Sequence, residues 1–162
     1  MSNGEEILFF HGLESKPMGT KSIRLSEHFR VKAPDFQGMD IWERLEKAEE
    51  LTEDMSELVV VGSSYGGLLT ALLFSRHPER FRNYVLMAPA LYLDAAEEIE
   101  RMPDDAVVIH GTHDDVVPIE SVRSFCEFYG LEIEEVDDDH RLHGSLDNMV
   151  AGVRRIFDTA PR

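Results

Sequence analysis

The chain has 162 residues, of which 43% are hydrophobic, and its 32 acidic and 16 basic side chains give a formal net charge of −16. This length predicts a single domain over residues 1–162 with room for one core. The negative charge disfavours nucleic acid and anionic membranes as partners. No apolar run reaches the roughly 18 residues of a membrane-spanning helix.

The N-terminus, MSNGEEILFF, has neither the basic region nor the apolar core of an export signal. The single cysteine, Cys126, cannot form a disulfide within the chain, which agrees with a reducing compartment. We therefore expect a cytoplasmic location. Cys126 lies in SFCEFYG, an amphipathic pattern that favours a small buried side chain over a catalytic thiol.

Short apolar runs alternate with helical periodicities along the whole chain. Strands are predicted over residues 7–10, 31–33, 57–61, 84–88, 106–110 and 131–136, and helices over 20–29, 41–51, 65–76, 94–101, 118–129 and 145–157. This alternation predicts an α/β fold of three layers, with a minimal, mostly parallel sheet of about six strands and helices on both faces. Ligands of such sheets bind beyond the carboxyl ends of the strands.

Several helix boundaries carry their own signals. Asp40 and Glu43 form a capping pair for the second helix, whose apolar stripe is Ile41, Leu45, Ala48 and Leu51. The helix over 118–129 begins at a proline and is followed by Gly130, which is typical of a helix end, and Ser145 is expected to cap the last helix.

The segment VVVGSSYGG, residues 59–67, contains a complete G-x-S-x-G pattern formed by Gly62, Ser64 and Gly66. A strand that turns sharply into a helix at such a serine is a nucleophile elbow, and the flanking glycines relieve the crowding of the turn. The same pattern also fits a plain strand-to-helix turn or a phosphate-binding loop. Polar groups at the ends of the other strands are needed to choose between these interpretations.

Three other strand ends carry polar groups. Asp114 follows the strand over 106–110, His140 follows the strand over 131–136, and His11-Gly12-Leu13 follows the first strand. The order serine, acid, histidine is the one expected of α/β hydrolases. In such a triad an imidazole takes the serine proton, and a carboxylate holds and stabilises the imidazole.

Alternatives exist for each member. Asp115 is an alternative to Asp114 as the acid, and His143 is an alternative to His140 as the base. His143 is, however, interpreted as a residue at the start of the last helix. A cluster of His110, His113, Asp114 and Asp115, with His140 and His143, would suit zinc or manganese. Because Gly111 breaks the segment, His110 and His113 do not share a helical face. We expect neither a metal nor a cofactor.

The segments HGLESKP, GSSYGG, GTHDDVVP and DDHRL together resemble the small bacterial α/β hydrolases of the YqiA-like esterase group. The resemblance covers nearly the whole chain in order. It implies Ser64 as nucleophile, Asp114 as acid, His140 as base, and the backbone of Leu13 and Tyr65 as oxyanion donors. The chain departs from that group in its three aspartates before His140, and it has no insertion large enough for a lid domain.

The expected function is a serine hydrolase that cleaves carboxylic esters, or thioesters, of short or soluble acyl groups through an acyl-enzyme. The expected partner is thus a small molecule, and the sequence leaves the oligomeric state open. The substrate contacts are predicted to be His11, Gly12, Tyr92 and Leu142. The alternative is a catalytically silent binding protein with the same fold.

Overall fold

A computed structural model describes residues 5–160 of the chain. The expectations about an export signal and about a domain spanning the whole chain fall partly on residues 1–4 and 161–162, which lie outside the described residues. In the described part, one six-stranded sheet has the order β2-β1-β3-β4-β5-β6, and every pair of neighbouring strands is parallel. The predicted mostly parallel sheet is therefore wholly parallel.

The strands are β1 Glu6–Phe10, β2 Arg30–Lys32, β3 Leu58–Ser63, β4 Phe81–Met87, β5 Val107–Gly111 and β6 Ile133–Val136. The α-helices are α1 Thr20–Ser26, α2 Ile41–Thr52, α3 Tyr65–Arg76, α4 Ile119–Tyr129 and α5 Leu146–Asp158, and two short 3-10 helices are η1 Pro78–Arg80 and η2 Asp94–Glu98. Each predicted strand and helix has a counterpart, and α3 has the predicted bounds.

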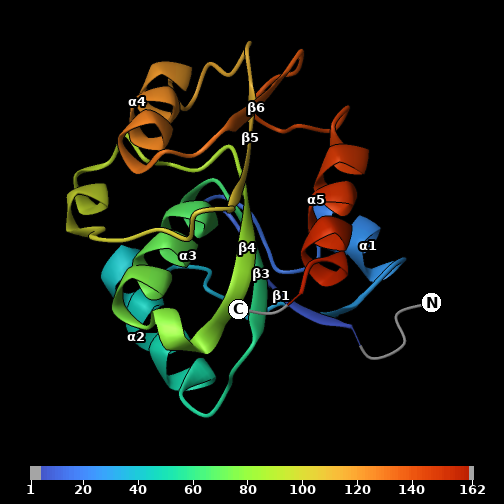
Figure 1. Cartoon of the computed structure of the whole chain (residues 1–162), viewed down its shortest axis with the longest axis vertical. Coiled ribbons are helices and arrows are strands. Elements are labelled where there is room, and N and C mark those ends of the chain that lie inside the picture. The colour runs from blue at the N-terminus through green and yellow to red at the C-terminus, as the bar shows by residue number, and fades with distance from the viewer. Residues whose placement is uncertain (1–4, 161–162) are drawn as a thin grey trace.

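The helices cover both faces of the sheet (Figure 1). Helices α2, α3 and α4 lie on one face, and α1 and α5 lie on the other. This arrangement follows from the right-handed crossover between parallel strands, which places the connecting helix on one face or the other. The prediction of three layers is confirmed.

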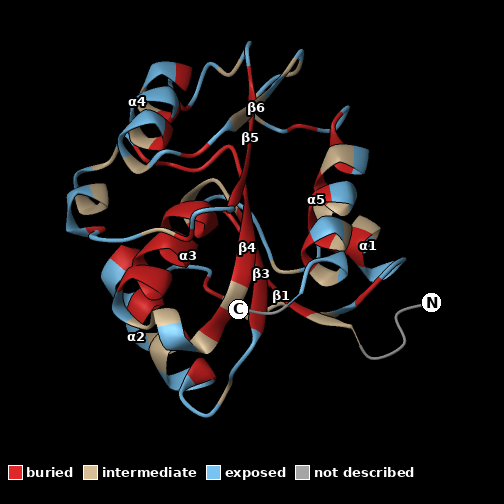
Figure 2. Cartoon of the chain, viewed as in Figure 1, coloured by how far each residue is buried: buried red, intermediate tan, exposed pale blue. Residues whose placement is uncertain are grey.

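Side chains alternate between two cores because successive residues of a strand point to opposite faces. In β1, Leu8 and Phe10 pack on the face of α2 and α3, whereas Ile7 and Phe9 pack on the face of α1 and α5. The central strands are buried on both faces, as Figure 2 shows. A continuous apolar run such as that of β3 is what a doubly covered parallel sheet requires.

Three local predictions need correction. The first helix ends at Ser26 rather than at residue 29, and the acidic segment over 94–101 forms only the 3-10 helix η2. In α2 the predicted stripe residue Leu51 is exposed, and the buried face is completed by Arg44 and Thr52. The capping box of Asp40 and Glu43, in contrast, is formed as predicted.

The sheet ends in two short edge strands. β2 has three residues, and β6 has four, of which Glu134 and Glu135 are acidic. Glu135 forms a two-pronged ion pair with Arg123 of α4, with distances of 2.7 and 2.8 Å. The edge strand β6 is thereby joined to the helix that packs beside it.

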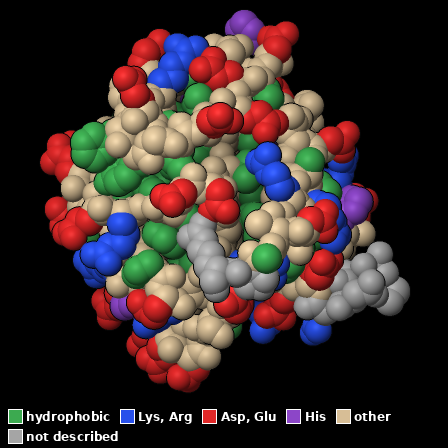
Figure 3. Space-filling view, viewed as in Figure 1, with side chains coloured by type: hydrophobic (Ala, Val, Ile, Leu, Met, Phe, Trp, Pro, Cys, Tyr) green, Lys and Arg blue, Asp and Glu red, His purple; other side chains and the backbone are tan. Residues whose placement is uncertain are grey.

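Acidic side chains are spread over the face shown in Figure 3 rather than gathered in one place. No helix in the described part of the chain is long and apolar enough to cross a bilayer. Hydrophobic side chains gather at the side of η2 and α4, where a surface groove of about 550 Å³ lies between residues 91–99 and α4.

Candidate active site

Ser64 occupies a strained turn between β3 and α3. Its backbone angles are φ 55° and ψ −111°, a conformation that residues other than glycine rarely adopt. The Ser64 amide donates to the Met87 carbonyl at 2.8 Å, and the Ser64 carbonyl accepts from Ala90 at 3.0 Å, so β4 and the segment after it hold the turn. The prediction that Ser64, and not Ser63, stands at the apex agrees with this geometry.

The glycines around Ser64 permit a close approach of backbones. A methyl group at Gly66 would collide with the carbonyl of Phe10 at the end of β1, and one at Gly62 would collide with Thr70 and with the Gly66 carbonyl. The first turn of α3 therefore lies directly against the ends of β1 and β3. This contact raises the Ser64 side chain above the carboxyl edge of the sheet.

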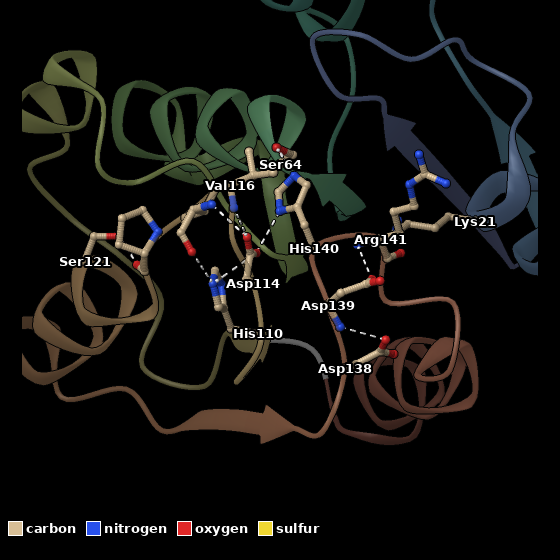
Figure 4. A network of polar contacts seen from close by, with 12 residues as sticks. Lys21, Ser64, His110, Asp114, Val116, Ser121, Asp138, Asp139, His140 and Arg141 are labelled. Carbon is tan, nitrogen blue, oxygen red and sulfur yellow. Dashed lines mark hydrogen bonds and ion pairs between the residues drawn. The ribbon is translucent and has the colours of Figure 1, made fainter.

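Ser64, His140 and Asp114 form one line of hydrogen bonds (Figure 4). Ser64 Oγ lies 3.0 Å from His140 Nε2, and His140 Nδ1 lies 2.7 Å from Asp114 Oδ2. The three side chains come from the ends of β3, β6 and β5. The structure thus brings together the three residues that the sequence predicts as nucleophile, base and acid.

The carboxylate of Asp114 is fully buried and accepts hydrogen bonds at both oxygens. Oδ1 accepts from the amides of Val116 and Val117 at 2.8 and 2.7 Å, and Oδ2 faces His140. The rival residues Asp115 and His143 are exposed, and no hydrogen bond or ion pair joins either of them to this line within the described chain. The geometry therefore favours Asp114 and His140.

His110, predicted from the sequence as a strand residue or a metal ligand, lies directly behind Asp114. Its Nε2 is 3.0 Å from the Val117 carbonyl and 3.3 Å from Asp114 Oδ2, and its side chain is fully buried. Burial lowers its pKa, although the Val117 carbonyl and the Asp114 carboxylate oppose that shift. A neutral His110 donates from Nε2 to the Val117 carbonyl, and its ring lies beside the Asp114 carboxylate. In the sequence, the spacing His-x-x-x-Asp at the end of a strand is the signal that could have indicated this contact.

The loop that carries His140 is fixed by its own aspartates. Asp138 accepts from the Gly144 amide at 2.9 Å and from the Ser145 hydroxyl at 2.8 Å, and Asp139 accepts from the Arg141 amide. Ser145 is the N-cap residue of α5 as predicted, but its side chain bonds Asp138 instead of a helix amide. The three aspartates before His140 thus include two that brace the loop.

Lys21 of α1 ties the same loop to the other side of the site. Its Nζ donates to the Arg141 carbonyl at 2.8 Å, next to His140 (Figure 4). Burial lowers the pKa of Lys21 to about 8, against the opposing charges of Asp138 and Asp139. This contact adds a long-range restraint to the residue that follows the histidine.

The loop after β1 lies beside Ser64. A methyl group at Gly12 would lie 3.6 Å from Ser64 Cβ. The prediction that His11 contacts the substrate is wrong, because the His11 side chain is fully buried. Its Nδ1 donates to the Gly12 carbonyl and its Nε2 accepts from the Phe36 amide, both at 2.8 Å. His11 therefore shapes the loop instead of facing a substrate.

The structure also contradicts the prediction that Leu142 contacts the substrate. Leu142 is 0% exposed and packs in the core on the α5 side, where its φ of 57° turns the chain. Tyr92, in contrast, is half exposed and lines the groove between residues 91–99 and α4, together with Phe125 and Phe128. Its role in substrate binding stays a prediction.

Neither the metal alternative nor the cysteine gains support. Among the described residues, no group of three or more His, Cys, Asp or Glu side chains is arranged to hold a metal ion. The side chain of His113 instead faces Asp137 at 2.6 Å on the surface. Cys126 is buried, and burial raises the pKa of its thiol to about 11, which disfavours a reactive thiolate.

Comparison with known proteins identifies the family. The sequence pattern of the alpha/beta hydrolase fold matches residues 8–106, more than half of the chain. The protein belongs to the α/β hydrolase fold family. Family membership supports a hydrolytic function, whereas the narrower resemblance to the YqiA-like group stays a prediction. No curated protein matches the sequence at a significant level.

Solved structures show the same fold at low identity. A protein of the α/β hydrolase superfamily from Xanthomonas campestris has 23% identity and a TM-score of 0.82, with 98% of this chain and 100% of that chain covered. Alpha/beta hydrolase domain-containing protein 10 from mouse has 15% identity and a TM-score of 0.81, covering 98% and 91%. A monoacylglycerol lipase from Paleococcus ferrophilus has 16% identity and a TM-score of 0.77, covering 97% and 96%.

The lowered pKa values of two buried histidines let us predict how the free energy of unfolding depends on pH. Burial lowers the pKa of both His11 and His110 below the ordinary 6.5. Below pH 6.5 the unfolded chain therefore binds protons that the folded chain rejects, and the free energy of unfolding falls. We expect a slope of at most about 1.4 kcal/mol per pH unit for each histidine.

Urea unfolding between pH 7.5 and 5.5 measures this slope, since carboxylates with lowered pKa values, such as Asp35 and Asp138, titrate below that range. H110Q should make the slope shallower. The matched control is H143Q, which replaces an exposed histidine, so that the comparison isolates the loss of the buried one. A slope that is the same in wild type and H110Q would contradict the prediction.

Proposed function

We propose that the protein is a serine hydrolase that cleaves carboxylic esters, or thioesters, through an acyl-enzyme. The observation that carries the proposal is the line from Ser64 Oγ to His140 Nε2 at 3.0 Å and from His140 Nδ1 to Asp114 Oδ2 at 2.7 Å. Family membership agrees with hydrolysis, and the strained conformation of Ser64 is the one that a nucleophile elbow uses.

In the proposed mechanism His140 is the general base. Because its Nδ1–H donates to Asp114, its Nε2 carries the lone pair that removes the proton from Ser64 as the hydroxyl attacks the carbonyl carbon. The same imidazole then returns the proton to the leaving alcohol or thiol. Water repeats the sequence on the acyl-enzyme and releases the acid. The buried charge of Asp114 stabilises the imidazolium in both halves.

The carbonyl oxygen gains negative charge in each transition state and needs hydrogen-bond donors. The amide of Tyr65, at the start of α3, and the amide of Leu13, in the loop beside Ser64, are the proposed donors. Neither amide is used in a hydrogen bond within the described part of the chain. The positive end of the α3 dipole favours the same charge.

The proposed substrates are small. Between β4 and β5 the described chain holds only η2 and its connecting loops, so no lid encloses the reacting carbonyl. Esters and thioesters carry good leaving groups and suit such an open site. A site without a lid offers little enclosed apolar surface to a long acyl chain, which favours short or soluble acyl groups.

A fluorophosphonate probe tests the nucleophile. The wild-type protein should be labelled covalently, since His140 activates the Ser64 hydroxyl, and S64A should show no labelling and no hydrolysis of a short p-nitrophenyl ester. S63A, which changes the neighbouring hydroxyl, is the control and should still be labelled. Absence of labelling in folded wild-type protein would favour a non-catalytic binding role.

The identity of the acid is tested by two asparagine variants. D114N should lower kcat by about 10³- to 10⁴-fold, because an amide facing His140 Nδ1 favours the wrong tautomer. D115N changes an exposed neighbour and should alter kcat by less than about twofold. Circular dichroism checks that both variants fold. A larger loss in D115N would transfer the role of the acid to Asp115.

The open site predicts a preference for short acyl groups. In a series of p-nitrophenyl esters and matching thioesters, kcat/KM should be highest for acyl chains of about two to four carbons and fall for longer ones. S64A, assayed in parallel, corrects for uncatalysed hydrolysis. A kcat/KM that rises steadily to acyl chains of about ten carbons would contradict the argument from the missing lid.

A further inference from the structure

Arg44 is a buried cation that takes part in none of the ion pairs between described residues, although the charge of Asp35 favours its charged form. It is 0% exposed and is the largest of the fully buried side chains. Buried arginines are normally paired with a carboxylate, because an uncompensated charge in the interior is costly. The position of Arg44 therefore requires an explanation from what surrounds it.

Three backbone carbonyls surround the Arg44 guanidinium. Its Nη1 donates to the His11 carbonyl at 2.8 Å, its Nη2 donates to the Gly12 carbonyl at 3.3 Å, and its Nε donates to the Met39 carbonyl at 3.2 Å. Two of these carbonyls belong to the loop beside Ser64. The charge is thus satisfied by the same short segment that carries the proposed oxyanion donor.

The Gly12 carbonyl fixes the direction of the next amide. The peptide unit between Gly12 and Leu13 is planar and trans, so its C=O and N–H point in opposite directions. This carbonyl accepts from the Ser15 amide at 3.4 Å, from the His11 ring and from Arg44, and the Arg44 contact directs it toward α2. The Leu13 N–H is consequently directed away from α2, and it has no acceptor among the described residues.

Arg44 also contacts the second proposed donor residue. The guanidinium carbon lies 4.8 Å from the centre of the Tyr65 ring and 5.7 Å from that of Phe36. One side chain therefore packs against Tyr65 at the start of α3 and bonds the loop that precedes Leu13. In a site of low dielectric constant, its positive charge also favours negative charge that develops nearby.

We infer that Arg44 is a positioning residue of the oxyanion site: it sets the Gly12–Leu13 peptide against Tyr65 so that both amides converge on the carbonyl oxygen of the substrate. The inference rests on the proposed function, because it assumes that Ser64 attacks a carbonyl. Arg44 touches neither the nucleophile nor the base. Its loss should therefore affect stabilisation of the oxyanion while leaving the line from Ser64 to Asp114 intact.

The test compares R44K with wild type and with K47M. Lys47 lies one turn further along α2 and over the same Phe36 ring at 5.5 Å, but it bonds the Asp35 carbonyl instead of the loop. R44K keeps the charge but not the fork of donors. We expect it to lower kcat on a short p-nitrophenyl ester by about 10- to 100-fold, which is less than the roughly 10²- to 10³-fold loss seen when an oxyanion donor itself is removed. KM should change by less than about threefold, and K47M should match wild type.

Binding of a boronic acid supplies a readout that a purely structural role would not move. A boronate adduct of Ser64 places a charged oxygen in the oxyanion site, so its inhibition constant should rise in R44K in parallel with the fall in kcat/KM. In R44A, added methylguanidinium should restore part of the lost kcat. If R44A does not fold, R44K alone decides.

The outcomes are distinguishable. Wild-type protein that is labelled by the fluorophosphonate, together with an R44K variant that keeps wild-type kcat and boronate affinity, would overturn the role of Arg44 and leave the hydrolase intact. A fall in the urea midpoint of R44K without a change in kcat would have the same meaning. Wild-type protein that is not labelled removes the proposed function, and the inference with it.

Discussion

The geometry of the site depends on the close approach of the start of α3 to the ends of β1 and β3, where a side chain on either glycine would collide with the neighbouring backbone. Gly66 lies against the carbonyl of Phe10, and Gly62 lies beneath the first turn of α3. Because α3 can start there, Ser64 is held at φ 55° above the edge of the sheet. The strain at this residue is opposed by the packing of β1, β3 and β4 around it, since nearly all residues of these strands are buried.

The site contains two buried charges of opposite sign, one on each side of Ser64, in a chain with a net charge of −16. On one side the buried carboxylate of Asp114 is satisfied by two amides and by His140, with a neutral His110 behind it. On the other side the buried guanidinium of Arg44 is satisfied by carbonyls of the loop after β1. Each charge is compensated by dipoles that the backbone holds in place, so neither has to neutralise the other.

The sequence predicted the parts of the fold that local signals determine. The apolar runs located all six strands, and the G-x-S-x-G pattern located Ser64, because both depend on neighbouring residues. Burial of polar groups was not predictable in the same way. His11 and Arg44 are buried because segments distant in the chain meet around them, although Arg44 does follow the helical period of Ile41 and Ala48. Leu142 is predicted from the sequence as a substrate contact and is instead a core residue for the same reason.

The shortness of β2 and β6 bears on how the protein behaves at high concentration. A parallel sheet that leaves long, flat edges exposed offers unpaired amides and carbonyls to other molecules, and this is a route to fibrous aggregation. Here one outer strand has only three residues, and the other presents Glu134 and Glu135, the latter held by Arg123. A second copy that approached β6 with its own β6 would meet the same acidic side chains, whereas β2, which carries Arg30 and Lys32, offers few backbone groups because it has only three residues. The charge of one edge and the shortness of the other therefore both disfavour extension of the sheet.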